Sequence, residues 1–196
     1  MCIFNQNNLN CLKVASKNDS RSRPEFSGVL FKKDKTVATD GFSLIEMSTP
    51  VETVNDYSVI QGKHAMQGFK PFIADRKSLE AVKLPRKTPT SLPVFSTFSI
   101  SHRDNEKVEF MVPATLALQE GKVIDGTFPD YERLFPKGKP VIELTINADY
   151  LKNMLDVMGK LNDQITLKIY GSEKPVVLEC STSEQYSRSM IMPVRK

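Results

Sequence analysis

The most constrained stretch of the chain is residues 123–136, which read VIDGTFPDYERLFP. An alternating apolar run predicts a strand that enters this stretch and ends at Asp125-Gly126, because glycine accepts backbone angles that other residues avoid. Pro129 and Pro136 then fix φ at two points and remove two donors, so neither a helix nor a central strand can continue. The stretch therefore predicts either a stiff linker between two domains or a surface loop with a few aromatic anchors.

The composition is ordinary for a soluble globular protein with one or two cores. The 196 residues are 40% hydrophobic and 26% charged, and a net charge of +4 permits an anionic partner without demanding one. Cys2, Cys11 and Cys180 lack metal-ligand spacing and predict reduced thiols. The sequence shows no signal-peptide pattern and no apolar run of membrane-spanning length, so we expect a cytoplasmic protein with no membrane partner.

The N-terminal half contains one pattern of strand, helix and strands twice. In the first repeat, Asn7 or Asn8 is predicted to cap a helix with an apolar face. Two strands are expected after it, over 26–32 and 35–49. The order of these elements predicts a mixed α and β unit.

The second repeat begins with a strand over 72–74. Asp75 or Ser78 is predicted to cap a short helix that Pro85 ends. Further strands are expected over 94–101, 107–112 and 115–124.

The third repeat has the clearest pattern. A strand is expected over 141–146, and Asn147 is predicted to cap a helix that ends before Gly159 at its C′ position. Lys152, Asp156 and Lys160 would share the polar face of this helix. The apolar face is expected to carry Leu151, Met154, Leu155 and Met158, and strands are expected over 165–170, 175–180 and 188–194.

Three stretches resemble, in the same order, parts of the bacterial DNA polymerase III beta subunit, the sliding clamp. Residues 124–136 resemble its linker between the second and third domains, 37–44 (VATDGFSL) resemble a hairpin of its second domain, and 192–195 (MPVR) resemble its extreme C-terminus. The resemblance implies an α+β, DNA-clamp-like fold of three repeated βαβββ units, with antiparallel sheets outside and helices on one face.

The resemblance also implies a domain organisation. Residues 1–127 would form a clamp-like domain like the second clamp domain, 128–138 the linker, and 139–196 half a domain like the end of the third. The first clamp domain and the first half of the third have no counterpart in this sequence. An unpartnered third repeat would leave its apolar helix face wet, so we expect a homo-oligomer, at least a dimer. A family ring contains twelve repeats, so four chains would close a tetrameric ring.

The clamp family binds linear peptides in a cleft built from the hairpin, the linker and the C-terminal strand. Phe42-Ser43 stands where the family usually has His-Arg, which removes a basic contact. The alternative for the C-terminal residues is that they form only a final core strand. Carried over residue by residue, the cleft would comprise Phe26, Thr39, Gly41, Phe42, Ser43, Leu44, Pro129, Arg133, Leu134, Pro175, Met190, Met192, Pro193, Val194 and Arg195.

Four lysines would face duplex DNA if a ring forms: Lys13, Lys17, Lys152 and Lys160. The alternative is that they belong to ordinary solvated helix faces. The function implied is a DNA sliding clamp-like processivity factor that tethers DNA polymerase, clamp-loader or other replication peptides to DNA without reading its sequence. The second hypothesis is a clamp-like interaction module that binds such peptides without encircling DNA.

Catalysis finds little support in the sequence. His64 and His102 are the only histidines and are expected in loops, so no catalytic triad or histidine metal site can be assembled. Asp40, Asp125 and Asp130 could be metal carboxylates, but Asp40 and Asp125 precede glycines in predicted turns and the turn explanation is sufficient. We therefore expect no enzyme activity, no cofactor and no metal.

Overall fold

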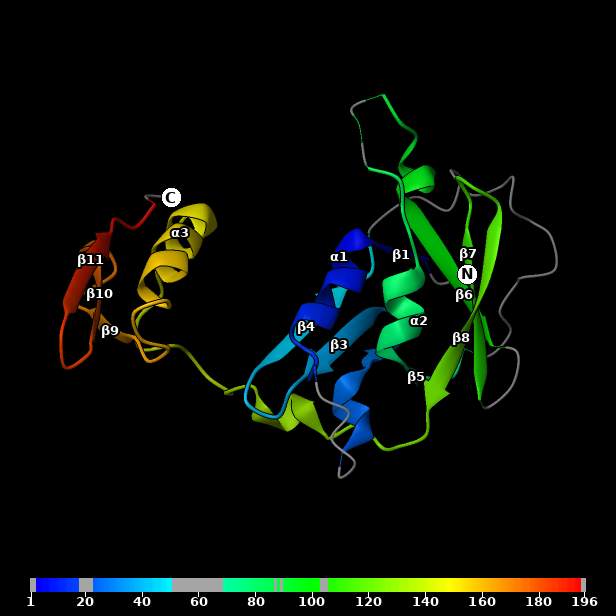
Figure 1. The fold of residues 1–196 in the computed structure, drawn as a ribbon, viewed down its shortest axis with the longest axis horizontal. Coiled ribbons are helices and arrows are strands. Elements are labelled where there is room, and N and C mark those ends of the chain that lie inside the picture. Colours follow the sequence, from blue (N-terminus) through cyan, green and yellow to red (C-terminus); the bar gives the residue numbers. More distant parts are fainter. Residues whose placement is uncertain are drawn as a thin grey trace. The chain divides into compact units, whose positions relative to one another are not determined.

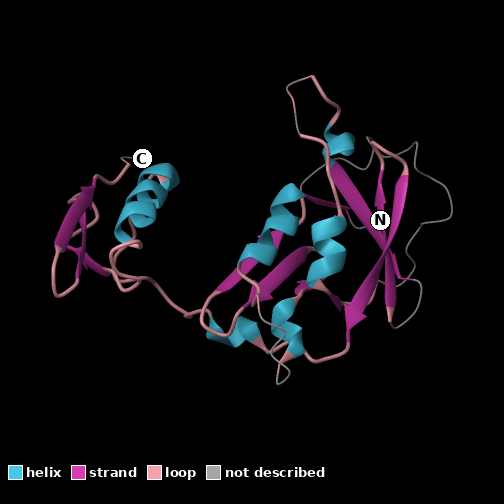
Figure 2. Ribbon diagram, viewed as in Figure 1, coloured by secondary structure: helices cyan, strands magenta, loops and turns pink. Residues whose placement is uncertain are grey.

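The computed structural model describes residues 3–17, 23–50, 69–86, 88, 90–102 and 106–194 (Figures 1 and 2). The chain forms two compact units, the N-terminal unit Met1–Asp130 and the C-terminal unit Tyr131–Lys196. The division falls inside the segment 128–138 that the sequence assigns to a linker. The α-helices are α1 (Gln6–Asn10), α2 (Arg76–Ala81) and α3 (Ala148–Met158), and the strands are β1 (Ile3–Asn5), β2 (Val29–Phe31), β3 (Lys35–Thr39), β4 (Leu44–Ser48), β5 (Phe72–Ala74), β6 (Thr97–His102), β7 (Lys107–Val112), β8 (Ala117–Ile124), β9 (Thr166–Ile169), β10 (Val176–Ser181) and β11 (Tyr186–Ile191).

The two repeats of the N-terminal unit are interlocked through their first strands. The eight strands in the described part of this unit follow the order β1-β6-β7-β8-β5-β2-β3-β4, and every neighbouring pair is antiparallel. Strand β1 of the first repeat pairs with β6 of the second, and β5 of the second pairs with β2 of the first. Helices α1 and α2 lie side by side over the sheet (Figure 1). Each repeat therefore supplies a strand that the other needs.

An N-cap marks the same point of each repeat. The side chains of Asn5, Asp75 and Asn147 each accept hydrogen bonds from backbone amides of the first helical turn. The prediction of Asn147 is confirmed, and of the two candidates in the second repeat, Asp75 and Ser78, Asp75 is the cap. The prediction of Asn7 or Asn8 in the first repeat is wrong, because Asn5 caps α1 and the Asn8 side chain accepts from the Asn5 backbone N–H.

A phenylalanine cluster joins the repeats. Phe4 of β1 lies edge-on against Phe31 of β2, with ring centroids 4.9 Å apart, and at 5.7 Å from Phe98 of β6. Phe31 also stacks on Phe72 of β5 at 5.5 Å. These rings come from both repeats, so the core cannot be divided between them.

Several predicted strands are shorter or split. Residues 24–27 and 93–96 each form a 3-10 turn that begins with a proline, since proline fits the first helical position. Strands β2 and β6 begin after these turns and are therefore shorter than predicted. The segment 35–49 contains two strands, because 40–43 form a turn between β3 and β4. His102 ends β6 and is not in a loop, whereas His64 lies outside the described residues.

The C-terminal unit is a three-stranded antiparallel sheet, β11-β10-β9, with one helix on it. Helix α3 has the predicted extent, but Gly159 is its C-cap at φ −67 and not a left-handed C′ residue. A side chain at Gly159 would approach the Leu155 carbonyl oxygen to 2.8 Å, which accounts for glycine here. Lys160 therefore lies in the turn beyond α3. The strand predicted over 141–146 is not formed, although Leu144 and Ile146 pack on the small core.

Both described cysteines, Cys11 and Cys180, are buried and form no disulfide with each other. Burial raises the pKa of the Cys11 thiol. No helix in the described part of the chain is long and apolar enough to cross a membrane.

Replacing Asn8 with alanine should destabilise the N-terminal unit. Asn8 is fully buried, and its amide donates to the Thr36 hydroxyl at 3.1 Å and to the Met47 and Ser48 carbonyls. Removing it leaves these acceptors buried, so we expect a loss of about 2–3 kcal/mol in the free energy of unfolding, measured by chemical denaturation. Asn10→Ala, at an exposed site of the same helix, should change it by at most about 0.5 kcal/mol. Equal effects of the two substitutions would contradict the prediction.

Candidate functional site

The turn between β3 and β4 is held by the side chains at its start. The Thr39 hydroxyl donates to the Ser43 carbonyl at 2.6 Å and accepts from the Gly41 N–H at 3.0 Å. One carboxylate oxygen of Asp40 accepts from the backbone N–H groups of Phe42 at 2.9 Å and Ser43 at 2.7 Å, and from the Ser43 hydroxyl. This turn presents Phe42 with its side chain 100% exposed.

The same hydrogen bonds lower the pKa of Asp40. The Ser43 amide contributes most and the Phe42 amide next, because both stabilise the charged carboxylate. The Asp40 charge is therefore a part of the turn, which supports the turn explanation for this carboxylate over a metal site.

The Phe26 ring packs against the turn at Gly41. Gly41 has φ +93, and a side chain there would come within 3.2 Å of the Phe26 ring. The Arg23 guanidinium lies 5.3 Å from the centre of the same ring. Phe26 and Thr39 are buried, whereas Gly41, Phe42 and Ser43 are exposed and Leu44 is half-buried. The surface available to a ligand on the N-terminal unit is therefore the turn itself and Leu44.

The C-terminal residues of the predicted cleft lie together in the C-terminal unit. Met190 and Met192 alternate with buried Ile191 and are 63% and 60% exposed, so this stretch is not only a core strand. Val176 pairs with Ile191, which places Pro175 beside Met192. Val194 is also exposed and donates its N–H to the Thr145 carbonyl at 2.8 Å, while Pro193 is half-buried.

The linker residues of the predicted cleft are divided between the units. Pro129 belongs to the N-terminal unit, whereas Arg133 and Leu134 lie in a 3-10 turn, Tyr131–Leu134, of the C-terminal unit. Both Arg133 and Leu134 are exposed. Arg195 lies outside the described residues. The single cleft between units thus stays a prediction.

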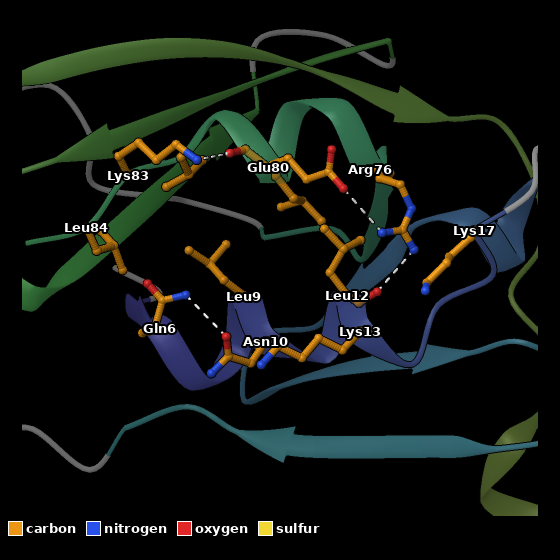
Figure 3. A pocket seen from close by; sticks show the side chains of 12 residues that line it. Gln6, Leu9, Asn10, Leu12, Lys13, Lys17, Arg76, Glu80, Lys83 and Leu84 are labelled. Carbon is orange, nitrogen blue, oxygen red and sulfur yellow. Dashed lines mark hydrogen bonds and ion pairs between the residues drawn. The ribbon is translucent and has the colours of Figure 1, made fainter. Parts of the chain in front are cut away.

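A groove with a basic rim lies between α1 and α2 (Figure 3). Its volume is about 730 Å³, and its apolar floor comes from Leu9, Leu12, Leu79 and Val82. Lys13 and Lys17 line this groove and are exposed.

The Arg76 side chain fixes the groove at one end. Its guanidinium donates to the carbonyls of Leu12, Ala15 and Ser16 at 3.1, 2.9 and 3.1 Å, and pairs with Glu80 at 3.3 Å. These bonds tie α2 to the chain that follows α1.

Lys83 also lines this groove, and the sequence reasoning missed it. Its ammonium donates to the Glu80 carbonyl at 2.8 Å. Lys13 and Lys83 are both the eighth residue after their N-caps, Asn5 and Asp75, so aligning the repeats on their caps would have found it.

Lys152 and Lys160 belong to the C-terminal unit and are exposed. Lys152 lies in α3 and Lys160 in the turn beyond it. The structure thus brings Lys13 and Lys17 together, and Lys152 and Lys160 near one helix.

The carboxylates that the sequence offers as possible metal ligands do not gather in the described part of the chain. Within the described ranges, no three side chains of His, Cys, Asp or Glu come together as a metal-binding group. Asp125 and Asp130 lie where β8 leads toward the unit boundary, in the irregular segment that the sequence predicts.

The arrangement of elements is similar to that of solved bacterial DNA polymerase sliding clamps. The beta subunit from DNA polymerase of Streptococcus pyogenes matches with a TM-score of 0.68 and 16% identity, covering 98% of this chain and 50% of that one. The DNA polymerase III beta chain of Streptococcus pneumoniae matches with a TM-score of 0.65 and 18% identity over 98% of this chain and 49% of that one. The fold is that of a bacterial beta sliding clamp. The predicted fold class is therefore confirmed.

The likeness to clamps is one of structure, at low sequence identity. The Caulobacter crescentus beta sliding clamp shares 20% identity over 98% of this chain and 50% of that one, with a TM-score of 0.61. The chain spans about half the length of the solved clamps that it matches. No family model and no curated protein matches the sequence.

The Asp40 turn should weaken in acid. Because the pKa of folded Asp40 is below its ordinary value of 3.8, the charged carboxylate stabilises the turn above that value, and this contribution is lost as the pH falls through the folded-state pKa. Amide NMR shifts of Phe42 and Ser43 should therefore titrate with a midpoint below 3.8. Asp40→Asn keeps an acceptor but removes the charge, so it should abolish this titration. A midpoint at or above 3.8 would contradict the assignment.

Proposed function

We propose that this chain is a sliding clamp-like processivity factor that tethers replication proteins to duplex DNA by binding their linear peptides. The observation that carries the proposal is the clamp fold over 98% of the chain. It is supported by exposed Phe42 and half-buried Leu44 in the turn at 41–44 and by exposed methionines at 190 and 192, in the two elements expected to hold a peptide. This role is non-enzymatic, and we place it in the cytoplasm.

The chemistry of the candidate residues suits a hydrophobic peptide. Met190 and Met192 are flexible apolar side chains that adapt to different anchors, and Leu44 adds a branched apolar surface. Arg133 and Arg195 would hold polar atoms of the peptide. Two apolar anchors at about 1.5–3 kcal/mol each, with a few hydrogen bonds, give micromolar affinity, about −8 kcal/mol.

Duplex DNA would contact the lysines on the helix side. Lys13 and Lys17, with Lys83, form the rim of one groove, and they would bind phosphates without reading bases. Lys152 and Lys160 would add contacts from the C-terminal unit. A homo-oligomer, a dimer or a tetrameric ring, would be needed to surround the duplex.

The alternative is a peptide-binding module that does not encircle DNA. Two observations favour it: Glu80 lies among the basic residues of the groove, and Asp156 lies one turn after Lys152 on the exposed side of α3. Both features dilute the positive face that a DNA-encircling protein needs.

Peptide binding should depend on Leu44. Leu44→Asp places a charge in the apolar surface and should weaken binding of a labelled Gln-Leu-x-Leu-Phe-type peptide at least about tenfold, measured by fluorescence anisotropy. Deletion of residues 192–196 should have a similar effect. Leu92→Asp, at an exposed leucine outside the predicted cleft, is the matched control and should bind normally. Unchanged binding by both folded cleft variants would place the peptide site elsewhere.

DNA binding should be weak, independent of sequence and steeply salt-dependent. Replacing Lys13 and Lys17 together with alanine should lower the slope of log affinity against log salt by about 0.9 for each phosphate that the variant no longer neutralises. Lys33→Ala, in the exposed turn between β2 and β3, should leave the slope unchanged.

Encirclement is tested separately, on closed circular DNA. A clamp loaded onto the circle should be released much faster after the DNA is cut. Release at the same rate before and after cutting, with peptide binding intact, would select the alternative function.

A further inference from the structure

The C-terminal unit has an open sheet edge and a strand-like segment outside the sheet, and the two fit each other. Strand β9 pairs only with β10 among the described strands, so its other edge is open. Segment 141–146 alternates like a strand but belongs to neither of the described sheets. Open edges of this kind are ready to pair with another strand. The pairing inside the N-terminal unit indicates which strand would occupy the open edge of β9.

The N-terminal unit shows how two repeats satisfy this need. There the first strand of each repeat pairs with the second strand of the other: Phe4 lies opposite Phe98, and Ala74 lies opposite Val29. In both cases the residue just before the N-cap faces the inward residue near the start of the partner strand. The exchange is reciprocal, because each repeat both gives its first strand and receives that of the other.

The third repeat can be aligned with the other two by its N-cap and by its strand pairings. Its N-cap is Asn147, so Ile146 corresponds to Phe4 and Ala74. The bond from the Val194 N–H to the Thr145 carbonyl corresponds to the pairing of Ile124 with Ile73. Following the strand registers back from Val194 places Leu178 at the position of Phe110, and Leu167 at the position of Ile100.

The inner face of β9 is exposed where its counterparts are buried. Leu167 is 52% exposed, whereas the corresponding Phe31 and Ile100 are 0% and 2% exposed. Ile169 is exposed on the same face. These side chains point into the core side of the sheet, because Leu167 lies opposite fully buried Leu178.

We propose that the C-terminal unit is completed by a second copy of this chain, through a two-fold exchange in which segment 141–146 of each copy pairs antiparallel with β9 of the other. The proposal rests on the pairing inside the N-terminal unit, and not on the proposed function. The same pairing then occurs twice, related by a two-fold axis, because each copy contributes both a segment 141–146 and a β9. Two-fold symmetry is the commonest symmetry of homo-oligomers.

The register that the caps impose is chemically consistent. Ile146 faces Ile165 of the second copy, so the inward residues Leu144 and Ile142 face Leu167 and Ile169 of that copy, and every inward pair is aliphatic. On the outer face, Glu143 comes opposite Lys168, a pair of opposite charges. A shift by one residue would place Glu143 against Leu167, so the pattern selects this register.

Helix α3 likewise exposes apolar side chains at positions that are buried in the first repeat. Leu151 and Met154 correspond to Leu9 of α1 and to Leu12 of the 3-10 turn that follows it. Leu9 and Leu12 are buried beside α2, whereas Leu151 and Met154 are only half-buried. Leu155 takes the place of Lys13 and is partly exposed. The same two-fold exchange brings a second α3 alongside, as α2 lies alongside α1 (Figure 1).

A disulfide tests the pairing and its register. Thr145 and Thr166 are exposed, and in the proposed register they are directly opposed across the two copies. Because Thr145 directs its carbonyl toward Val194, the pair is of the non-hydrogen-bonded type, whose Cα atoms lie about 4.5 Å apart, within disulfide reach. The Thr145→Cys/Thr166→Cys variant should form a covalent dimer under mild oxidation. Each single variant should not, nor should Glu143→Cys/Thr166→Cys, which is displaced by two residues.

A second variant tests the interface without a crosslink. Leu167→Lys places two charges in the symmetric interface and should raise the dimer dissociation constant about 100-fold or more in sedimentation equilibrium. Tyr186→Lys, at a similarly exposed residue on the opposite edge of the sheet, should remain dimeric. Circular dichroism verifies folding of both variants.

Three outcomes would overturn the proposal: a strictly monomeric folded chain at high micromolar concentration, an intrachain disulfide in the double-cysteine variant, or a dimer that Leu167→Lys leaves intact. Peptide binding is measured on the same samples. Leu167→Lys should bind the peptide like the unmodified chain, so failure of the dimer and failure of the proposed peptide site give different results.

Discussion

The exchange of first strands between repeats is the constraint on which the N-terminal unit depends. Strand β1 completes the sheet of the second repeat and β5 completes that of the first, and the phenylalanines on these strands share one core. Neither repeat can bury Phe4 or Phe31 by itself. The helices follow from the same exchange, because pairing in both directions brings α1 beside α2, where Arg76 locks them through three carbonyls. A single repeat is therefore a half-structure, and this accounts for the exposed inner face of the third.

The sequence predicts those features of the fold that are set by neighbouring residues, and it fails where residues far along the chain decide. The caps Asp75 and Asn147 and the extent of α3 follow from neighbouring residues, and they are confirmed. Asn5 was missed because Asn7 and Asn8 are equally good caps on local grounds, whereas Asn8 is used in a buried network with residues far along the chain. Segment 141–146 has a correct strand pattern but forms no strand, since a strand needs a partner and no local pattern supplies one.

The candidate site shows the same division. The resemblance selected the turn at 39–44, and the structure explains its shape through Asp40, Thr39 and the left-handed Gly41. It did not distinguish residues that support the turn from those that a ligand would reach: Phe26 and Thr39 are buried, while Phe42 is exposed. Exposure depends on packing between elements distant in sequence. Lys83 was missed for a different reason, since only the alignment of repeats reveals it.

The eighth residue after the N-cap bears on both the proposed dimer and the proposed DNA contacts. The eighth residue after the N-cap is Lys13 in the first repeat and Lys83 in the second, but Leu155 in the third. In the N-terminal unit, where two helices already cover the sheet, this position is free to carry charge at the rim of a groove. In the third repeat it extends the apolar stripe of α3, which the proposed exchange would place against a second α3. Lys152 keeps a charge elsewhere on the same helix. In the proposed exchange this face would bind a second α3, which would leave room for phosphate contacts only at its margins, so association of the third repeat would come before any role in holding DNA.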